Sequence, residues 1–317
     1  MDILILGSGY MANEYLKVLS NTKFKVLVIG RSEKKIDDLK KNYPNVFFFS
    51  GGIQNFLMSG EKLPEICFNC VSIENLFETT ISLINNNVKK ILVEKPGSLN
   101  VEHLKSMQKA ALDFDADVYI GYNRHFYSSV QKLKECCYND GGITSLNFEF
   151  TEWIHTINEK DYSKESLQKW MMSNSSHVID LVFHLIDYPK DLYCIQGGKD
   201  NISWHKSGSI FVGCGISNQN IPFSYHSNWE SSGRWSIEIS TYIGRYLLMP
   251  MEILQFKKKG TINYIEIEID DKLDKDFKHG VFNQINSFLN NEFKNLVSLE
   301  DQIKNIIYIN KIAGYLD

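Results

Sequence analysis

A chain of 317 residues is long enough for two ordinary domains, and a hydrophobic content of 43% supports a substantial buried core. The formal net charge of -4 gives no global reason to expect nucleic acid or an anionic membrane as a partner, so a small-molecule ligand is favoured. The sequence shows no apolar run of membrane-spanning length and no signal-peptide pattern, and its six cysteines are scattered, so we expect a cytoplasmic protein.

The first 121 residues alternate short apolar segments with amphipathic ones. The apolar segments predict strands at 2–6, 25–29, 46–49, 66–71, 90–93 and 117–121. The amphipathic segments predict helices at 11–20, 32–42, 75–86 and 101–113. This alternation predicts a Rossmann domain over residues 1–121, a doubly wound parallel sheet that binds a dinucleotide.

The first predicted strand runs into a turn with the pattern G-x-G-x-x-A. In that pattern Gly7 permits the tight turn, Gly9 lets a pyrophosphate approach the backbone, and Ala12 permits close packing of the next helix. Free N–H groups at the start of that helix favour phosphate. We therefore expect the cofactor to contact this loop, which consists of Gly7, Ser8, Gly9, Tyr10, Met11 and Ala12.

The end of the second predicted strand bears on the choice of cofactor. An NAD-selective site usually places an Asp or Glu there, whereas this chain has Gly30, Arg31 and Ser32. Arg31, with Ser32 and Lys35, is suited to contact a 2′-phosphate, because a guanidinium offers a planar fork of donors. The sequence predicts NADP, and NAD stays an open alternative. A second alternative is that Arg31 is a solvated loop residue that contacts no cofactor.

The ends of the fourth and fifth predicted strands are expected near the nicotinamide, because the carboxyl ends of parallel strands face the ligand crevice. Cys70 and Val71 end the fourth, and Glu94 and Lys95 end the fifth. Lys95 is a candidate to exchange a proton with a substrate hydroxyl; a solvated strand cap is its alternative reading. Cys67 and Cys70 have CxxC spacing, but we interpret them as buried thiols within an apolar run.

Residues 122–317 predict a second α/β domain with a large, mostly antiparallel open sheet. Strand-like segments lie at 145–152, 209–216, 223–229, 235–239 and 262–269, separated by turns that contain Gly and Asn. Helices are predicted at 128–136 and 175–186, and the tail at 281–315 has helical periodicity. We expect the substrate to bind in this domain.

The predicted helix at 175–186 carries three titratable groups on an otherwise apolar segment. His177, Asp180 and His184 stand at i, i+3 and i+7, which places them on one face. A proton relay and a metal site are both compatible with this spacing. We expect no metal, because a lysine and a histidine suffice to move the proton in a nicotinamide reaction.

Together these motifs resemble those of the Gfo/Idh/MocA family of glucose-fructose oxidoreductases and inositol dehydrogenases. The resemblance rests on the glycine turn, Glu94-Lys95-Pro96, the stretch from Gly121 to Arg124, and Asp180-xxx-His184. It implies that Lys95, Asp180 and His184 are catalytic and line the site where substrate meets nicotinamide, with Asp180 orienting His184. It also implies sugar or cyclitol substrates, and a homodimer or homotetramer formed through the C-terminal sheet.

The chain departs from the family pattern at two places. Asn69-Cys70-Val71-Ser72 stands where a Thr-Pro-Asn turn is common, and residues 173–177 replace a glycine-rich run. Neither change removes a proton-transfer candidate. We expect substrate to be bound by six side chains, namely Lys95, Asn123, Arg124, His177, Asp180 and His184. Arg124 is suited either to a substrate carboxylate or phosphate, or to an ion pair between domains.

The expected function is an NAD(P)-dependent dehydrogenase or reductase acting on a hydroxyl or ketone of a sugar, cyclitol or nucleotide-sugar. Surface-carbohydrate biosynthesis is one setting for such an enzyme. Two alternatives stay open: a redox-cycling lyase or glycosidase that retains its cofactor, and a non-catalytic NADP-sensing or scaffold protein. The set Lys95, Asp180 and His184 argues against the second alternative.

Overall fold

The computed structural model describes residues 1–315, which divide into two compact units. Unit 1 comprises residues 1–122 and 276–303, and unit 2 comprises residues 123–275 and the remainder from 304. The first boundary lies one residue beyond the predicted one. The segment 276–303 differs from the sequence prediction, which placed it in the second domain, because its helix and its short strand pack on elements of unit 1.

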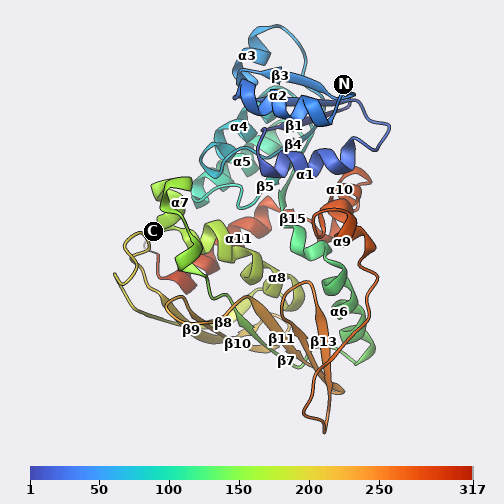
Figure 1. Ribbon diagram of the computed structural model, residues 1–317. Helices are drawn as coiled ribbons and strands as arrows, with labels where there is room; N and C mark the ends of the chain where they lie inside the picture. The colour runs from blue at the N-terminus through green and yellow to red at the C-terminus, as the bar shows by residue number, and fades with distance from the viewer. Residues whose placement is uncertain (316–317) are drawn as a thin grey trace. The chain divides into compact units, whose positions relative to one another are not determined.

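Unit 1 is built on a seven-stranded sheet in the order β15-β6-β5-β4-β1-β2-β3. All neighbouring strands are parallel except the β15 edge, which is antiparallel to β6. This confirms the predicted doubly wound sheet (Figure 1). The strands are β1 (Ile3–Leu6), β2 (Val26–Gly30), β3 (Phe47–Ser50), β4 (Ile66–Asn69), β5 (Lys90–Glu94), β6 (Asp117–Gly121) and β15 (Val297–Ser298).

Helices cover the sheet of unit 1, which explains why β1 and β2 are apolar and buried along their whole length. They are α1 (Tyr10–Leu19), α2 (Glu33–Asn42), α3 (Gly52–Met58), α4 (Ile73–Asn85), α5 (Val101–Asp113), α10 (Val281–Leu289) and the start of α11 (Leu299–Ala313). α4 packs on α5, and α1 packs on α10 (Figure 1). Between α1 and α10, the ring of Phe68 lies 5.1 Å from that of Tyr15 and 5.3 Å from that of Phe288.

Unit 2 is built on an eight-stranded sheet in the order β14-β13-β12-β11-β7-β10-β9-β8. The pair β7 and β10 is parallel and the other pairs are antiparallel, which confirms the mostly antiparallel sheet. The strands are β7 (Ser145–Glu149), β8 (Pro189–Gly197), β9 (Ile210–Ser217), β10 (Pro222–Asn228), β11 (Ser236–Ser240), β12 (Gly244–Leu248), β13 (Leu254–Lys258) and β14 (Ile265–Glu266).

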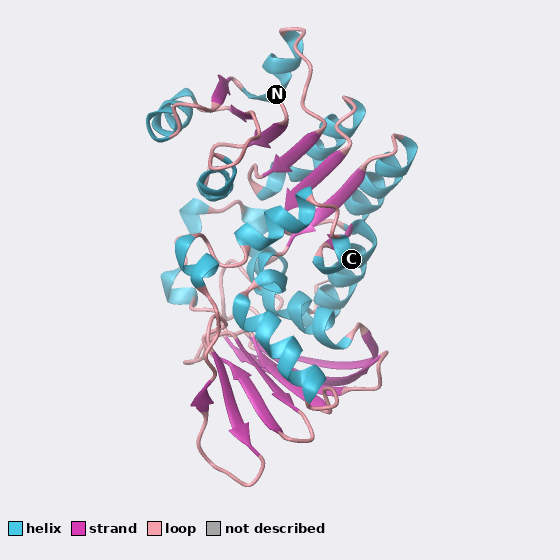
Figure 2. Ribbon diagram, turned by 90° about the vertical axis from the view of Figure 1, so that its right-hand side faces the viewer, coloured by secondary structure: helices cyan, strands magenta, loops and turns pink. Residues whose placement is uncertain are grey.

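One face of this second sheet is packed and the other is open. Helix α8 (Ser176–Ile186) packs on β7 and β11, and α6 (Ser128–Asn139) packs on β13 (Figure 1). Figure 2 shows helices on one face of this sheet. Side chains therefore alternate between buried and exposed along β9 and β10. The shorter helical segments are η1 (Asn123–Phe126), η2 (Ile154–Thr156), η3 (Glu159–Asp161), α7 (Lys164–Gln168), η4 (Met171–Ser175), α9 (Lys272–Asp276) and, in unit 1, η5 (Phe293–Asn295).

The described residues contain no helix that is both long and apolar enough to cross a membrane. All six cysteines are free thiols. Cys67 and Cys70 are buried in and just after β4, and burial raises the pKa of both thiols, in line with their interpretation as small buried side chains.

Candidate functional site

A cavity of about 640 Å³ lies in unit 1 where β1, β2, β4 and β5 end. This is the edge at which doubly wound sheets bind ligands. Ala12 is instead fully buried in α1, which suits its predicted packing role. The other residues predicted to contact cofactor all line the cavity: Gly7, Ser8, Gly9, Tyr10, Met11, Gly30, Arg31, Ser32, Cys70, Val71, Glu94 and Lys95.

Gly7 and Gly9, the two glycines of the first turn, are needed for different structural reasons. Gly7 has a φ of +125°, and a Cβ there would lie 2.7 Å from the carbonyl oxygen of Cys70. A Cβ on Gly9 would meet nothing within 4 Å, so the missing side chain leaves open space beside the start of α1. Gly9 is also the N-cap residue of α1, where free N–H groups favour an anion. The residues therefore fit a dinucleotide pyrophosphate.

This difference predicts separable effects of two alanine substitutions. Gly9→Ala should leave the free energy of unfolding within about 1 kcal/mol of the parent and weaken dinucleotide binding about 10-fold or more, because the methyl group displaces the charged pyrophosphate from its donors. Gly7→Ala should lower the free energy of unfolding by about 1–3 kcal/mol, because a non-glycine residue is strained at that φ. Denaturant unfolding and fluorescence titration measure the two effects; parent-like affinity in Gly9→Ala would contradict the first.

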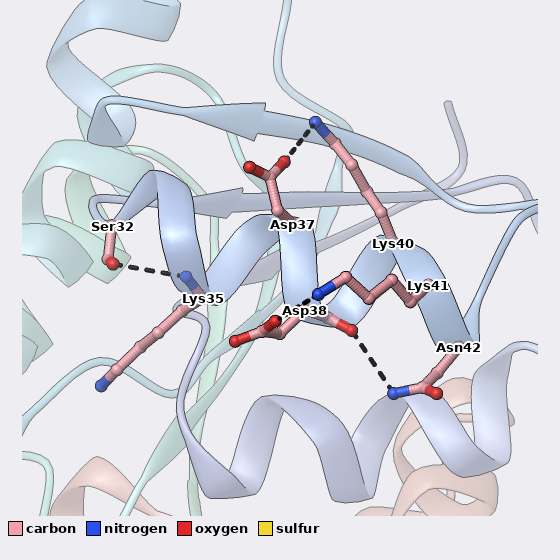
Figure 3. Close-up of polar contacts among 7 residues, drawn as sticks. All are labelled: Ser32, Lys35, Asp37, Asp38, Lys40, Lys41 and Asn42. Carbon is pink, nitrogen blue, oxygen red and sulfur yellow. Dashed lines mark hydrogen bonds and ion pairs between the residues drawn. The ribbon is translucent and has the colours of Figure 1, made fainter.

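Two cations, Arg31 and Lys35, line the cavity near the end of β2. Ser32 caps α2 by accepting a hydrogen bond from the N–H of Lys35 at 3.4 Å. Figure 3 shows the Lys35 amine extended away from Lys40 and Lys41, which pair with carboxylates of their own helix. Arg31 and Lys35 line the cavity, and neither forms an ion pair within residues 1–315.

The end of β5 is held in a tight turn that brings Lys95 to the cavity. The N–H of Gly97 donates to the carbonyl of Glu94 at 2.9 Å, and Gln302 of α11 donates to the carbonyl of Pro96 at 2.9 Å. The Glu94 side chain accepts a hydrogen bond from the Tyr15 hydroxyl. Burial raises the pKa of both Tyr15 and Glu94, and the hydrogen bond between them anchors the first residue of this turn.

Part of the cavity wall was not predicted from the sequence. Gly51 and Gly52, just after β3, line the cavity and have φ values of +97° and +84°. The Gly-Gly dipeptide after a predicted strand was the available signal for a turn that approaches a ligand. Side chains of α4 also contribute, namely Ile73, Asn75, Glu78, Thr79 and Ser82; nothing in their spacing marked them beforehand.

In unit 2, two elements bring polar groups to Asp180, which is 3% exposed on α8. One carboxylate oxygen lies 2.7 Å from Nε2 of His125 on η1, and the other accepts a hydrogen bond of 2.8 Å from Asn305 on α11. Because a buried carboxylate is costly without partners, these two bonds account for its place in an apolar helix. His125 is a residue that the sequence analysis did not single out.

His184 lies next to this pair but does not replace His125 in it. Its ring is stacked on that of His125, with centroids 3.9 Å apart and an interplanar angle of 18°. Its Nε2 lies 3.3 Å from Nζ of Lys134 on α6, so the lysine donates and the histidine nitrogen accepts. The structure thus differs from the expectation that Asp180 orients His184: Asp180 holds His125, on which His184 is stacked.

The remaining predicted substrate residues also lie in unit 2. Asn123 is buried on η1, and Arg124 follows it with its guanidinium 4.6 Å from the ring of Trp235. His177 begins the first turn of α8, with its ring 6.1 Å from that of Trp235. Within residues 1–315, no group of three or more His, Cys, Asp or Glu side chains is placed to hold a metal ion.

Several solved structures share this fold over nearly their whole length. A UDP-N-acetylglucosamine 3-dehydrogenase from Acidithiobacillus ferrooxidans is 13% identical, with a TM-score of 0.74 over 100% of this chain and 97% of that one. An oxidoreductase from Agrobacterium radiobacter, in complex with NAD+, L-tartaric acid and magnesium, is 11% identical, with a TM-score of 0.79 over 99% and 96%. A Gfo/Idh/MocA family oxidoreductase from Vibrio cholerae is 13% identical, with a TM-score of 0.75 over 99% and 96%.

These likenesses confirm, at the level of fold, the architecture that the Gfo/Idh/MocA resemblance implied. No protein-family model matches the sequence, and no curated protein matches it either.

Proposed function

We infer that this chain is an NAD(P)-dependent oxidoreductase that acts on a hydroxyl or ketone of a sugar-like substrate. The observation that carries the proposal is the cavity at the strand ends of unit 1. The turn from Gly7 to Gly9, which we call the glycine cradle, borders open space in this cavity, and Lys95 lies on one wall. It is supported by the shared fold with a UDP-N-acetylglucosamine 3-dehydrogenase and with an oxidoreductase that holds NAD+.

The protein's own groups would hold the cofactor and move a proton. The glycine cradle and the N-terminus of α1 would bind the pyrophosphate, and the walls after β4 and β5 would contact the nicotinamide. When bound, the nicotinamide exchanges a hydride with the substrate carbon that bears the oxygen. In the oxidative direction, Lys95 or His184 accepts the hydroxyl proton.

In this proposal His125 and His184 have different roles, because only His125 is paired with the buried Asp180. His125 is fixed by Asp180 and serves as a platform on which the His184 ring is stacked. The Nε2 of His184 accepts from Lys134, so a proton taken from the substrate would go to Nε2 and would displace the Lys134 donor. In this proposal His184 transfers the proton, and Asp180 and His125 are positioning residues.

The cofactor preference is proposed from the cations near the end of β2. Without an acidic residue at this point, Arg31 and Lys35 favour the 2′-phosphate of NADP. NADPH should bind at least as tightly as NADH, and Arg31→Asp should weaken NADPH binding about 10- to 100-fold, because a charge-assisted hydrogen bond is replaced by repulsion.

Fluorescence titration with both cofactors tests this preference. Lys40→Asp is the matched control, because Lys40 lies on α2, the helix that follows Arg31, is 52% exposed and pairs with Asp37 outside the cavity. The control should leave the ratio of the two affinities unchanged. A clear preference for NADH in the unmodified protein would defeat the NADP assignment, and failure to bind either cofactor would defeat the proposed function.

The wider setting follows from the same proposal. We propose a cytoplasmic enzyme that forms a homodimer or homotetramer through the open face of the unit 2 sheet. Four large apolar side chains on β8 and β9 support such an interface, since they are exposed on that sheet: Tyr193, Ile195, Val212 and Ile216. Neither nucleic acid nor a membrane is expected as a partner.

A further inference from the structure

Unit 2 contains an alternating stack of arginine and tryptophan side chains to which the proposed hydride transfer assigns no role. Arg124 lies over the Trp235 ring, with 4.6 Å between its Cζ and the ring centroid. Arg234 has its Cζ 5.2 Å from the same ring and 4.5 Å from the ring of Trp153. We call these four residues, Arg124, Trp153, Arg234 and Trp235, the Arg–Trp stack.

The geometry of the stack leaves the arginine donors available. An arginine stacked on an aromatic face uses the face of its guanidinium, and the N–H groups on the edge stay free to donate in the plane. The platforms are fixed, because Trp153 donates its Nε1–H to the carbonyl of Gly233 at 2.8 Å and Trp235 is only 6% exposed. The Nε of Arg124 is buried and has no hydrogen-bond partner within residues 1–315.

The stack also carries positive charge that no nearby carboxylate neutralises by direct contact. Neither Arg124 nor Arg234 forms an ion pair in the described part of the chain. Glu152 acts on both only from a distance, because its carboxylate accepts hydrogen bonds from Ser175 at 2.6 Å and Asn174 at 2.9 Å. Two like charges beside one ring repel each other, and an anion between their donors would relieve that repulsion.

The position of the stack connects it with the groups assigned to proton transfer. His177 lies 6.1 Å from Trp235 and stands one helical turn before Asp180 on α8, and Arg124 is the residue before His125. A substrate whose reacting carbon lies near His184 therefore has a cationic donor site within the same unit. Phosphate oxygens match the planar donor fork of arginine better than the hydroxyls of a neutral polyol.

We propose that the Arg–Trp stack binds a phosphate group of the substrate, so that the enzyme acts on phosphorylated sugars rather than on neutral sugars or cyclitols. The choice of phosphorylated sugars as substrates rests on the proposed oxidoreductase function, whereas the binding of phosphate to the Arg–Trp stack does not. Two sources share this chemistry, a sugar monophosphate and the diphosphate of a nucleotide-sugar.

Isothermal titration of the full chain, without dinucleotide, tests the binding with three probes: uridine diphosphate, glucose 1-phosphate and myo-inositol. We expect one or both phosphates to bind and myo-inositol not to compete. Arg124→Gln and Arg234→Gln should each weaken phosphate binding about 10- to 100-fold, the range for a hydrogen bond between charged groups. The affinity should also fall as salt is raised.

Arg245→Gln is the matched control, because it removes the same charge from the same unit at a residue paired with Glu238 at 2.8 Å. It should bind phosphate like the parent. Binding of uridine diphosphate alone would assign the site to a nucleotide-sugar, and equal binding of both probes would assign it to any phosphate ester.

The proposal is overturned if neither phosphate binds, or if the Arg234→Gln variant binds phosphate as tightly as the parent. The Arg234→Gln variant alone decides between these outcomes if Arg124→Gln fails to fold. Phosphate binding by a protein that binds no dinucleotide would leave the anion site standing and remove the proposed oxidoreductase function. Dinucleotide binding and turnover of neutral polyols, without phosphate binding, would remove the phosphate site and leave the proposed oxidoreductase function standing.

Discussion

Lys95→Met is expected to slow hydride transfer by about 10²- to 10⁴-fold while changing dinucleotide affinity little. The side chain lies on the cavity wall after β5, beyond the glycine cradle and the end of β2 that would hold the phosphates and adenosine. Methionine keeps the length of the side chain and removes the group that exchanges the proton. The loss corresponds to about 3 to 5 kcal/mol of activation barrier.

Single-turnover kinetics measure this loss, with a substrate found by screening cyclic polyols, sugar phosphates and nucleotide-sugars. Lys105→Met is the matched control, because Lys105 is 53% exposed on α5 and pairs with Glu102 on the surface. His184→Ala should slow the same step. If both groups act on one proton route, the double variant should be little slower than the slower single variant. Near-normal rates in both Lys95→Met and His184→Ala would overturn the assignment of these groups.

Asp180→Ala is expected to lower the free energy of unfolding by about 3–5 kcal/mol, the range for removing one member of a buried polar pair. The substitution leaves His125 without its carboxylate partner and removes the acceptor of the Asn305 amide, at a site that is 3% exposed. Asp180→Asn preserves the shape of the side chain, so its loss of stability should be smaller while His184 still loses its fixed platform.

Denaturant unfolding measures both variants, with Asp113→Ala as the control. Asp113 is the exposed last residue of α5, where a substitution should change stability by less than about 0.5 kcal/mol. An Asp180→Ala protein as stable as this control would show that the pair with His125 contributes nothing to the fold. Parent-like turnover in Asp180→Asn would argue against a positioning role.

The strands and helices of unit 1 could be predicted well because local pattern determines them. The spans of α5 and β6 agree with their sequence predictions, since Asn100 precedes α5 and Asp113 ends it, and β6 begins at Asp117 and ends at Gly121. α3 was missed because a seven-residue helix offers too few turns for a periodic signal. β8 was not resolved as a strand because its mixture of buried and exposed positions gives no regular alternation.

In the candidate site too, the residues set by local sequence could be predicted and those set by tertiary packing could not. The glycine cradle and the wall after β5 lie on consecutive residues, so motif and position were enough to find them. The partner of Asp180 was not predictable, because His125 is 55 residues earlier in the chain and Asn305 is 125 residues later. Helical spacing suggested His184 instead, one turn away, and tertiary packing determined which histidine the carboxylate holds.

The return of residues 276–303 to unit 1 means that most of unit 2, residues 123–275, is inserted within the sequence of unit 1. During synthesis on the ribosome, the first 122 residues must wait for more than half of the remaining chain before α10 reaches α1 and β15 covers the edge of β6. Until then Phe68 lacks the ring of Phe288 that packs on it. A gene fragment that ends after residue 122 encodes the whole glycine cradle and yet leaves apolar surface and a strand edge exposed, which favours aggregation.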